Sequence, residues 1–158
     1  MESIIEIRHQ VVRIKAPFDR FTHNIEAALV PLDWELMEHV VQEPDRVKEQ
    51  LERTNNGHAF LFLMVDHGAL LAIGGVPHKA RLYAFGNPLL LLKMTKLDMR
   101  AGLYGPMHLL VYEAADQQVY AEYDLPTSLF GQFGNPEVTK VAEVITGKIA
   151  ALLDAADQ

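Results

Sequence analysis

Four apolar segments of strand length dominate the middle of the chain and constrain its fold more than any other feature. The segments cover residues 59–65 (AFLFLMV), 81–85, 107–112 and 119–123, and turn-forming residues lie between them. Short apolar runs bounded by Gly, Pro, Asn or Asp are typical of β-strands. A short turn at 114–117 joins the last two segments, so we expect them to form a hairpin. The sequence therefore predicts a largely antiparallel sheet.

Helical patterns around these strands predict how the sheet is covered. A strand is expected within 4–15, with a bulge near Val11–Val12, and an amphipathic helix follows from Pro17. A long final helix is expected over about 136–153, and an extra helical segment at about 31–57. The predicted class is α+β, with a single antiparallel sheet covered by helices on one face in the order β-α-β(4)-α.

Length, charge and composition exclude several classes of protein. The 158 residues suit a single domain spanning 1–158, and the net charge of −7 argues against nucleic acid as a partner. The chain has no cysteine, which excludes disulfides, thiolate catalysis and Cys-ligated metals. Its apolar segments are too short to span a membrane, and charges interrupt the apolar stretch at its start. We therefore expect a cytoplasmic protein with no membrane partner.

Four short motifs follow one another in the middle of the chain. They are Val-Asp-His at 65–67, Phe-Gly-Asn-Pro at 85–88, Leu-Leu-Val-Tyr-Glu at 109–113 and Tyr-Asp-Leu-Pro at 123–126. In this order and spacing they resemble the family called domain of unknown function 302, most clearly over residues 65–125. The resemblance implies an α+β fold of the TATA-binding-protein-like type. It implies no activity, because the family has none established, so no catalytic residue carries over.

The helix expected after Phe-Gly-Asn-Pro is unusually apolar. Asn87 is placed to cap this helix and Pro88 to open it, and Leu and Met side chains then surround the segment from Leu89 to Met99. A helix that is apolar all round is buried all round. Three explanations remain open: burial within its own domain under the 31–57 segment, a homodimer through Leu89–Met99, or a pocket for an apolar ligand. A Leu91→Glu change is expected to break such a dimer or to unfold the domain.

A ligand-binding or sensing module is the first functional hypothesis. A small, partly apolar molecule would bind between the sheet and the apolar helix, where flexible methionines suit an adaptable pocket. On their strands, Tyr112, Tyr120 and Tyr123 could line one sheet face that binds a ring by stacking. The candidate ligand-binding residues are Asp66, His67, Phe85, Asn87, Met94, Tyr112, Tyr123 and Asp124.

Two further hypotheses are a homodimeric interaction module without ligand and a small enzyme. In the enzyme, Asp66 or His67 would act as acid or base. Adjacent residues on a strand point to opposite faces, however, and Asp66 could instead bond backbone amides where the strand ends. Residues 69–73, which follow, fit either a short helix or a second strand.

The seven histidines form no recognisable metal motif. Glu35 and His39 have helical spacing, which is more typical of a solvated pair than of metal ligands. A single histidine such as His67, His78 or His108 could serve as an axial haem ligand. Nothing in the sequence favours haem over another small apolar ligand, and no metal site is predicted.

Overall fold

A computed structural model of the chain describes residues 2, 4–55 and 57–158. These residues form one six-stranded sheet with the strand order β1-β6-β5-β4-β3-β2. Neighbouring strands run antiparallel, except that the short β2 runs parallel to β3. The predicted α+β class with a largely antiparallel sheet is thus confirmed, and the short parallel β2 is the exception. The strands are β1 (His9–Ile14), β2 (Val30–Pro31), β3 (Phe60–Asp66), β4 (Ala80–Gly86), β5 (Met107–Glu113) and β6 (Val119–Asp124).

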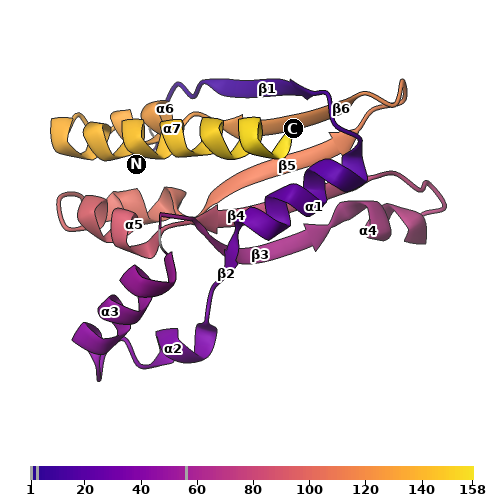
Figure 1. Ribbon diagram of the computed structural model, residues 1–158. Coiled ribbons are helices and arrows are strands. Elements are labelled where there is room, and N and C mark those ends of the chain that lie inside the picture. The colour runs from indigo at the N-terminus through magenta and orange to yellow at the C-terminus, as the bar shows by residue number, and fades with distance from the viewer. Residues whose placement is uncertain (1, 3, 56) are drawn as a thin grey trace.

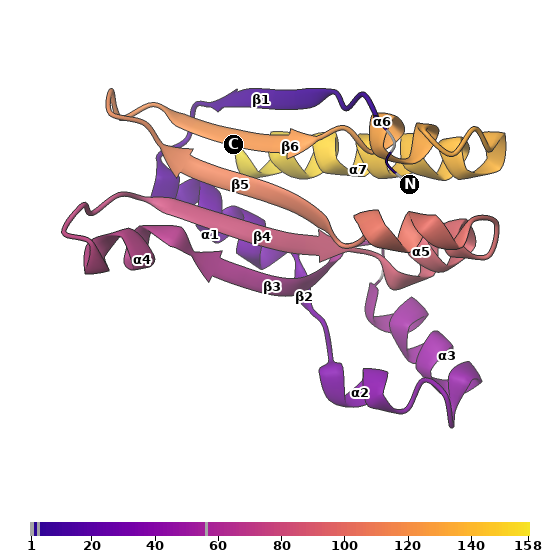
Figure 2. The same ribbon diagram turned by 180° about the vertical axis from the view of Figure 1, so that it is seen from behind.

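Helices cover one face of the sheet and leave the other open. The helices α1 (Phe18–Ala28) and α7 (Pro136–Ala156) lie across one face (Figure 1). Figure 2 shows the opposite face, in front of which no described helix passes. No helix among the described residues is both long and apolar enough to cross a membrane. The remaining helices are α2 (Trp34–Glu38), α3 (Pro44–Asn55), α4 (His67–Ile73), α5 (Pro88–Thr95), the 3₁₀-helix η1 (Met99–Tyr104) and α6 (Pro126–Gly131).

The main hydrophobic core lies between the sheet and the two covering helices. Side chains alternate along a strand, so every second residue of β5 points into this core: Met107, Leu109 and Val111 are buried. Ile149 and Leu153 of α7 pack against them from the other side. At one end of the sheet, α5, η1 and α6 gather, whereas α4 lies at the opposite end (Figure 1).

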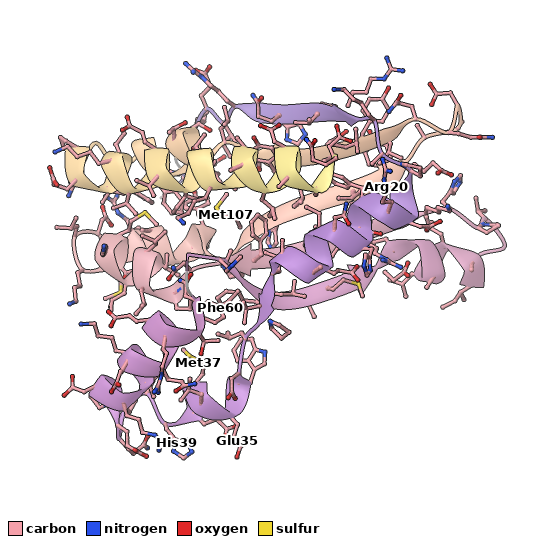
Figure 3. The ribbon with its side chains drawn as sticks, viewed as in Figure 1. Arg20, Glu35, Met37, His39, Phe60 and Met107 are labelled. Atoms are coloured by element: carbon pink, nitrogen blue, oxygen red, sulfur yellow. The ribbon has the colours of Figure 1, made fainter. Side chains whose placement is uncertain are left out.

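The segment between β2 and β3 builds a second, smaller cluster. Val47 and Leu51 of α3 pack with Leu32 and Phe60, and Leu89 of α5 closes the cluster. Figure 3 shows Phe60 where this segment joins the sheet. The predicted helical segment at 31–57 is therefore confirmed as α2 and α3, and its own apolar contacts attach it to the fold.

A hydrogen-bonded charged group lies between α1 and β4. The Arg81 guanidinium donates to Glu26 Oε1 at 2.9 Å and to Thr22 Oγ1 at 3.2 Å. The hydroxyl of Tyr83 donates to the same Glu26 oxygen at 2.8 Å. Burial, together with the bond to Glu26, raises the pKa of Tyr83 well above its ordinary value. The phenol therefore stays neutral and acts as a fixed donor that joins α1 to the sheet.

The first strand differs from its prediction. It begins at His9, which pairs with Asp124 at the end of β6, and the carbonyl of Arg8 accepts from the amide of Leu125 just beyond that strand at 2.8 Å. The expected bulge near Val11–Val12 is also wrong, because β1 pairs with β6 without a break. A register shift occurs instead in β3, between Leu61 and Leu63.

The apolar segment after Asn87 is not one helix through Met99. The helix α5 ends at Thr95, whose hydroxyl donates back to the carbonyl of Leu91 at 3.1 Å. Asp98 then accepts from the backbone amide of Arg100 at 3.0 Å and opens η1. Asp98 therefore acts as a second N-cap. The segment Leu89–Met99, expected as a single helix in a dimer interface, is thus divided between two short helices.

Candidate functional site

A pocket of about 350 Å³ lies between the end of β4, α5 and the second half of α7. Its deep wall consists of buried side chains, all apolar: Phe85, Met94, Met107, Phe130 and Ile149. Figure 3 shows Met107 in the space between α7 and α5. Because this wall offers no hydrogen-bonding side chain, the interior favours an apolar group over a polar one.

Polar side chains line the pocket only where its residues are half-buried or exposed. His58 and Lys148 are exposed and Asn87 is half-buried. The Lys148 ammonium donates to the backbone carbonyl of Gly57 at 3.0 Å. No Asp or Glu is among the described residues that line the pocket. The pocket is therefore an apolar hollow with a polar, positively charged mouth.

The local sequence explains why these polar groups meet. Antiparallel pairing places Phe60, at the start of β3, opposite Gly86, at the end of β4. His58 and Asn87 therefore lie at the same end of the sheet. Asn87 accepts from the amide of Leu89 at 2.8 Å, and Pro88 occupies the first helical turn, so both predictions for the start of this helix are confirmed.

The helix α5 lies between two other parts of its own chain. Leu89 contacts the second cluster, and Leu91 and Met94 contact the main core. Leu90 lines the pocket, while Leu92 is exposed. Contacts within the chain thus account for Leu89, Leu91 and Met94, and the pocket accounts for Leu90.

The eight candidate residues do not form one site. Phe85, Asn87 and Met94 line the pocket, and the other five lie elsewhere. Asp66 caps α4, since its Oδ1 accepts from the amide of Ala69 at 2.8 Å. His67 is the first residue of that helix, at the other end of β3 from the pocket. Residues 69–73, left open as helix or strand, are helical.

A second group of polar residues lies across β1, β6 and β5 on the open face of the sheet. Asp124 Oδ1 accepts a hydrogen bond from His9 Nδ1 at 2.8 Å, and His9 Nε2 lies 3.1 Å from Glu122 Oε2. The Tyr112 hydroxyl donates to Glu122 Oε1 at 2.6 Å. A groove of about 300 Å³ passes beside His9, Glu122 and Asp124, with Leu110 on its wall.

Hydrogen bonding shifts the pKa of each central member of this group. The hydrogen bond between His9 and Asp124 raises the pKa of the imidazole most, and the bond between His9 and Glu122 raises it further. The bonds from Tyr112 and His9 lower the pKa of the Glu122 carboxyl. The bond to Glu122 raises the pKa of Tyr112 to about 12. The imidazolium and the carboxylate therefore stabilise each other's charged forms.

The tyrosines of the hairpin lie on both faces of the sheet. Tyr112 and Tyr120 stack with ring centroids 5.7 Å apart on the open face. Tyr123 is buried in the main core, because its position alternates with that of Tyr120 and Glu122 along β6. The idea that all three tyrosines line one sheet face is therefore wrong.

The remaining histidines lie away from the pocket. His67, His78 and His108 are not among its lining residues. Glu35 lies in the first turn of α2 and His39 directly after its last residue, and both are exposed (Figure 3). Among the described residues, no group of three or more His, Asp or Glu side chains is arranged so that it could hold a metal ion.

Sequence reasoning missed Lys148 and His58 at the pocket and His9 and Glu122 on the open face. For Lys148 a signal was present. It lies three residues after Ile145 and directly before Ile149, beside the apolar stripe of α7. A charge in that position is expected at the edge of a buried surface.

Comparison with known proteins places this fold in a family without an assigned activity. A family model described as "Domain of unknown function DUF302" matches residues 37–156. The crystal structure of an uncharacterized conserved DUF302 protein from Bacillus stearothermophilus is similar, with a TM-score of 0.65 and 17% identity over 94% of this chain and 97% of that chain. No curated protein matches the chain. The similarity therefore supports the fold and leaves the chemistry to the residues themselves.

Proposed function

Since this chain belongs to the DUF302 family, whose function is unknown, we propose from its own pocket that it binds a small, largely apolar molecule. The observation that carries the proposal is the apolar hollow between β4, α5 and α7. Ligand sites are typically concave and apolar, with a few polar groups and volumes of roughly 300–1,000 Å³. The pocket has this character at the lower end of that range, so it suits a single small molecule.

The pocket lies where the fold can hold its walls in place. Asn87 fixes the start of α5 by capping it, and Leu91 packs closely on Gly105 on the opposite wall. Met94 and Met107 lie on two of the walls. Their flexible thioethers can adapt to the shape of a ligand without a change in the surrounding helices.

The direct test is binding of N-phenyl-1-naphthylamine, an uncharged apolar probe whose fluorescence rises in apolar surroundings. We expect saturable binding to the wild-type protein and a loss of affinity of at least about tenfold in Ala151→Phe, because the ring would occupy the pocket from α7. Ala150→Phe is the matched control, since Ala150 is also exposed on α7 but does not line the pocket. Equal binding by both variants, or none by the wild type, would refute the proposal.

Self-association is a second candidate function, favoured by the solvent side of α5 and η1. Leu92, Leu97, Met99 and Leu103 are all exposed there, the last two at 80% and 79%. Several exposed apolar side chains close together in the chain are typical of a protein interface, and a second copy of this chain would supply an equally apolar partner. Leu91 faces the core instead, so the Leu91→Glu change would test folding rather than this interface.

Sedimentation velocity can test the interface. Met99→Glu should convert a dimer into a monomer, whereas Ile73→Glu, at a residue 85% exposed on α4, should leave the mass unchanged. A wild-type protein that stays monomeric at high concentration would exclude this candidate and leave ligand binding unaffected.

A further inference from the structure

Building on the proposed function, we infer that the ligand is a medium-length carboxylate whose apolar chain fills the pocket and whose anionic head binds Lys148. The first reason is the charge of the lining. Lys148 is the one charged side chain among the described residues around the pocket, in a chain with a net charge of −7. The pocket has an ammonium group at its mouth and no carboxylate among its described lining residues. This charge distribution favours the binding of an anion at the mouth.

The second reason is that Lys148 lacks a carboxylate partner within the described structure. Its ammonium group bonds the Gly57 carbonyl and belongs to none of the ion pairs formed by the described residues. The positions three and four residues away on α7 carry only apolar side chains, including Val144 and Ile145. Lys140 on the same helix, by contrast, pairs with Glu137 at 2.7 Å. The charge of Lys148 therefore remains available to a ligand.

The third reason is the arrangement of apolar and polar groups along the pocket. The deep wall, from Met94 to Ile149, is buried and apolar, while Lys148 and His58 are exposed. A ligand that satisfies both parts has a hydrocarbon body and a charged end. The long apolar stem of Lys148 can lie along such a body while its ammonium group reaches the head in water.

The donors at the mouth suit a singly charged head better than a phosphate. Phosphate groups are usually bound by several donors, such as arginines or the free amides at a helix start. Here Asn87 Oδ1 already accepts from the amides of Leu89 and Leu90, and Pro88 has no amide hydrogen. One lysine remains as the cation, which matches the single charge of a carboxylate.

The test is displacement of N-phenyl-1-naphthylamine from the purified full chain by decanoate, decan-1-ol or decyltrimethylammonium at neutral pH and low salt. We expect decanoate to displace the probe at about three- to fivefold lower concentration than decanol, because an exposed ion pair contributes that much to affinity. The cation should be the weakest competitor. High salt should reduce the preference for decanoate.

Substitution of the lysines identifies the anchor. In Lys148→Met, decanoate and decanol should displace the bound probe equally well. Lys148→Arg should retain the preference for decanoate, and Lys140→Met, the control on the same helix, should have no effect. If the probe binds and decanol competes as well as decanoate, the carboxylate inference is wrong while the proposed pocket stands. If decanoate keeps its preference in Lys148→Met, the anchor is wrong. If the wild type does not bind the probe at all, the proposed function fails, and the inference fails with it.

Discussion

Replacement of the buried Tyr83 by Phe tests whether its hydrogen bond between the sheet and α1 stabilises the fold. Tyr83 is fully buried, and its hydroxyl donates to Glu26 at 2.8 Å. The change removes only the hydroxyl, so it leaves the ring packing intact, and Glu26 keeps its bond from Arg81. A hydrogen bond to a charged group contributes about 1.5–3 kcal/mol. For a chain of this size, that loss lowers the melting temperature by about 2–4 °C for each kcal/mol.

Tyr112→Phe provides the matched comparison. Tyr112 also donates to a carboxylate, Glu122, and its bond is shorter at 2.6 Å. It lies half-buried on the open face, however, where water can replace the lost donor, so we expect a cost of at most about 1 kcal/mol. Urea unfolding of the two variants beside the wild type, followed by circular dichroism, measures both free energies. A larger loss in Tyr112→Phe than in Tyr83→Phe would show that bond length, rather than burial, sets the contribution, and would refute the reasoning.

Two further predictions concern α4 and the open face. Gly68→Ala should lower the free energy of unfolding by about 1–3 kcal/mol, because the new Cβ would lie 2.1 Å from the backbone oxygen of His78; an unchanged urea midpoint would show that the loop yields. In an NMR titration, His9 should have a pKa above 6.5, and Asp124→Asn should lower it more than Glu122→Gln does, because the bond to Asp124 is the larger cause. His9 should contribute its full stabilisation below pH 6.5, and this contribution should be lost as the pH rises through the raised pKa. Equal stability of His9→Gln and the wild type at pH 5.5 would contradict this prediction.

The strands β3 to β6 could be predicted because each is an apolar run bounded by turn-forming residues. The hairpin of β5 and β6, for example, follows from two apolar runs and a polar turn. The boundaries that failed depend on distant partners. β1 starts at His9 because β6 ends at Asp124, and no local pattern near His9 contains that information.

The pocket could be anticipated only in part. Phe85, Asn87 and Met94 line it because one motif ends β4 and begins α5, so their proximity is local. Lys148 and His58 are 90 residues apart in sequence and meet because α7 crosses the sheet beside the start of β3. The angle of such a crossing depends on the packing of the whole core, which a single sequence does not reveal.

The pairing of β1 with β6 has a consequence for how the chain assembles. His9 and Asp124 are 115 residues apart, whereas β3 to β6 each pair with the strand nearest along the chain. During synthesis the inner strands can pair as they emerge, but β1 has to wait until β6 has left the ribosome. Closing so long a loop is entropically unfavourable and slow. Until β1 pairs with it, β6 is an edge strand with unpaired backbone groups, and such edges promote the aggregation of nascent chains. Of the six strands in this sheet, the first to be synthesised is therefore the last that can pair.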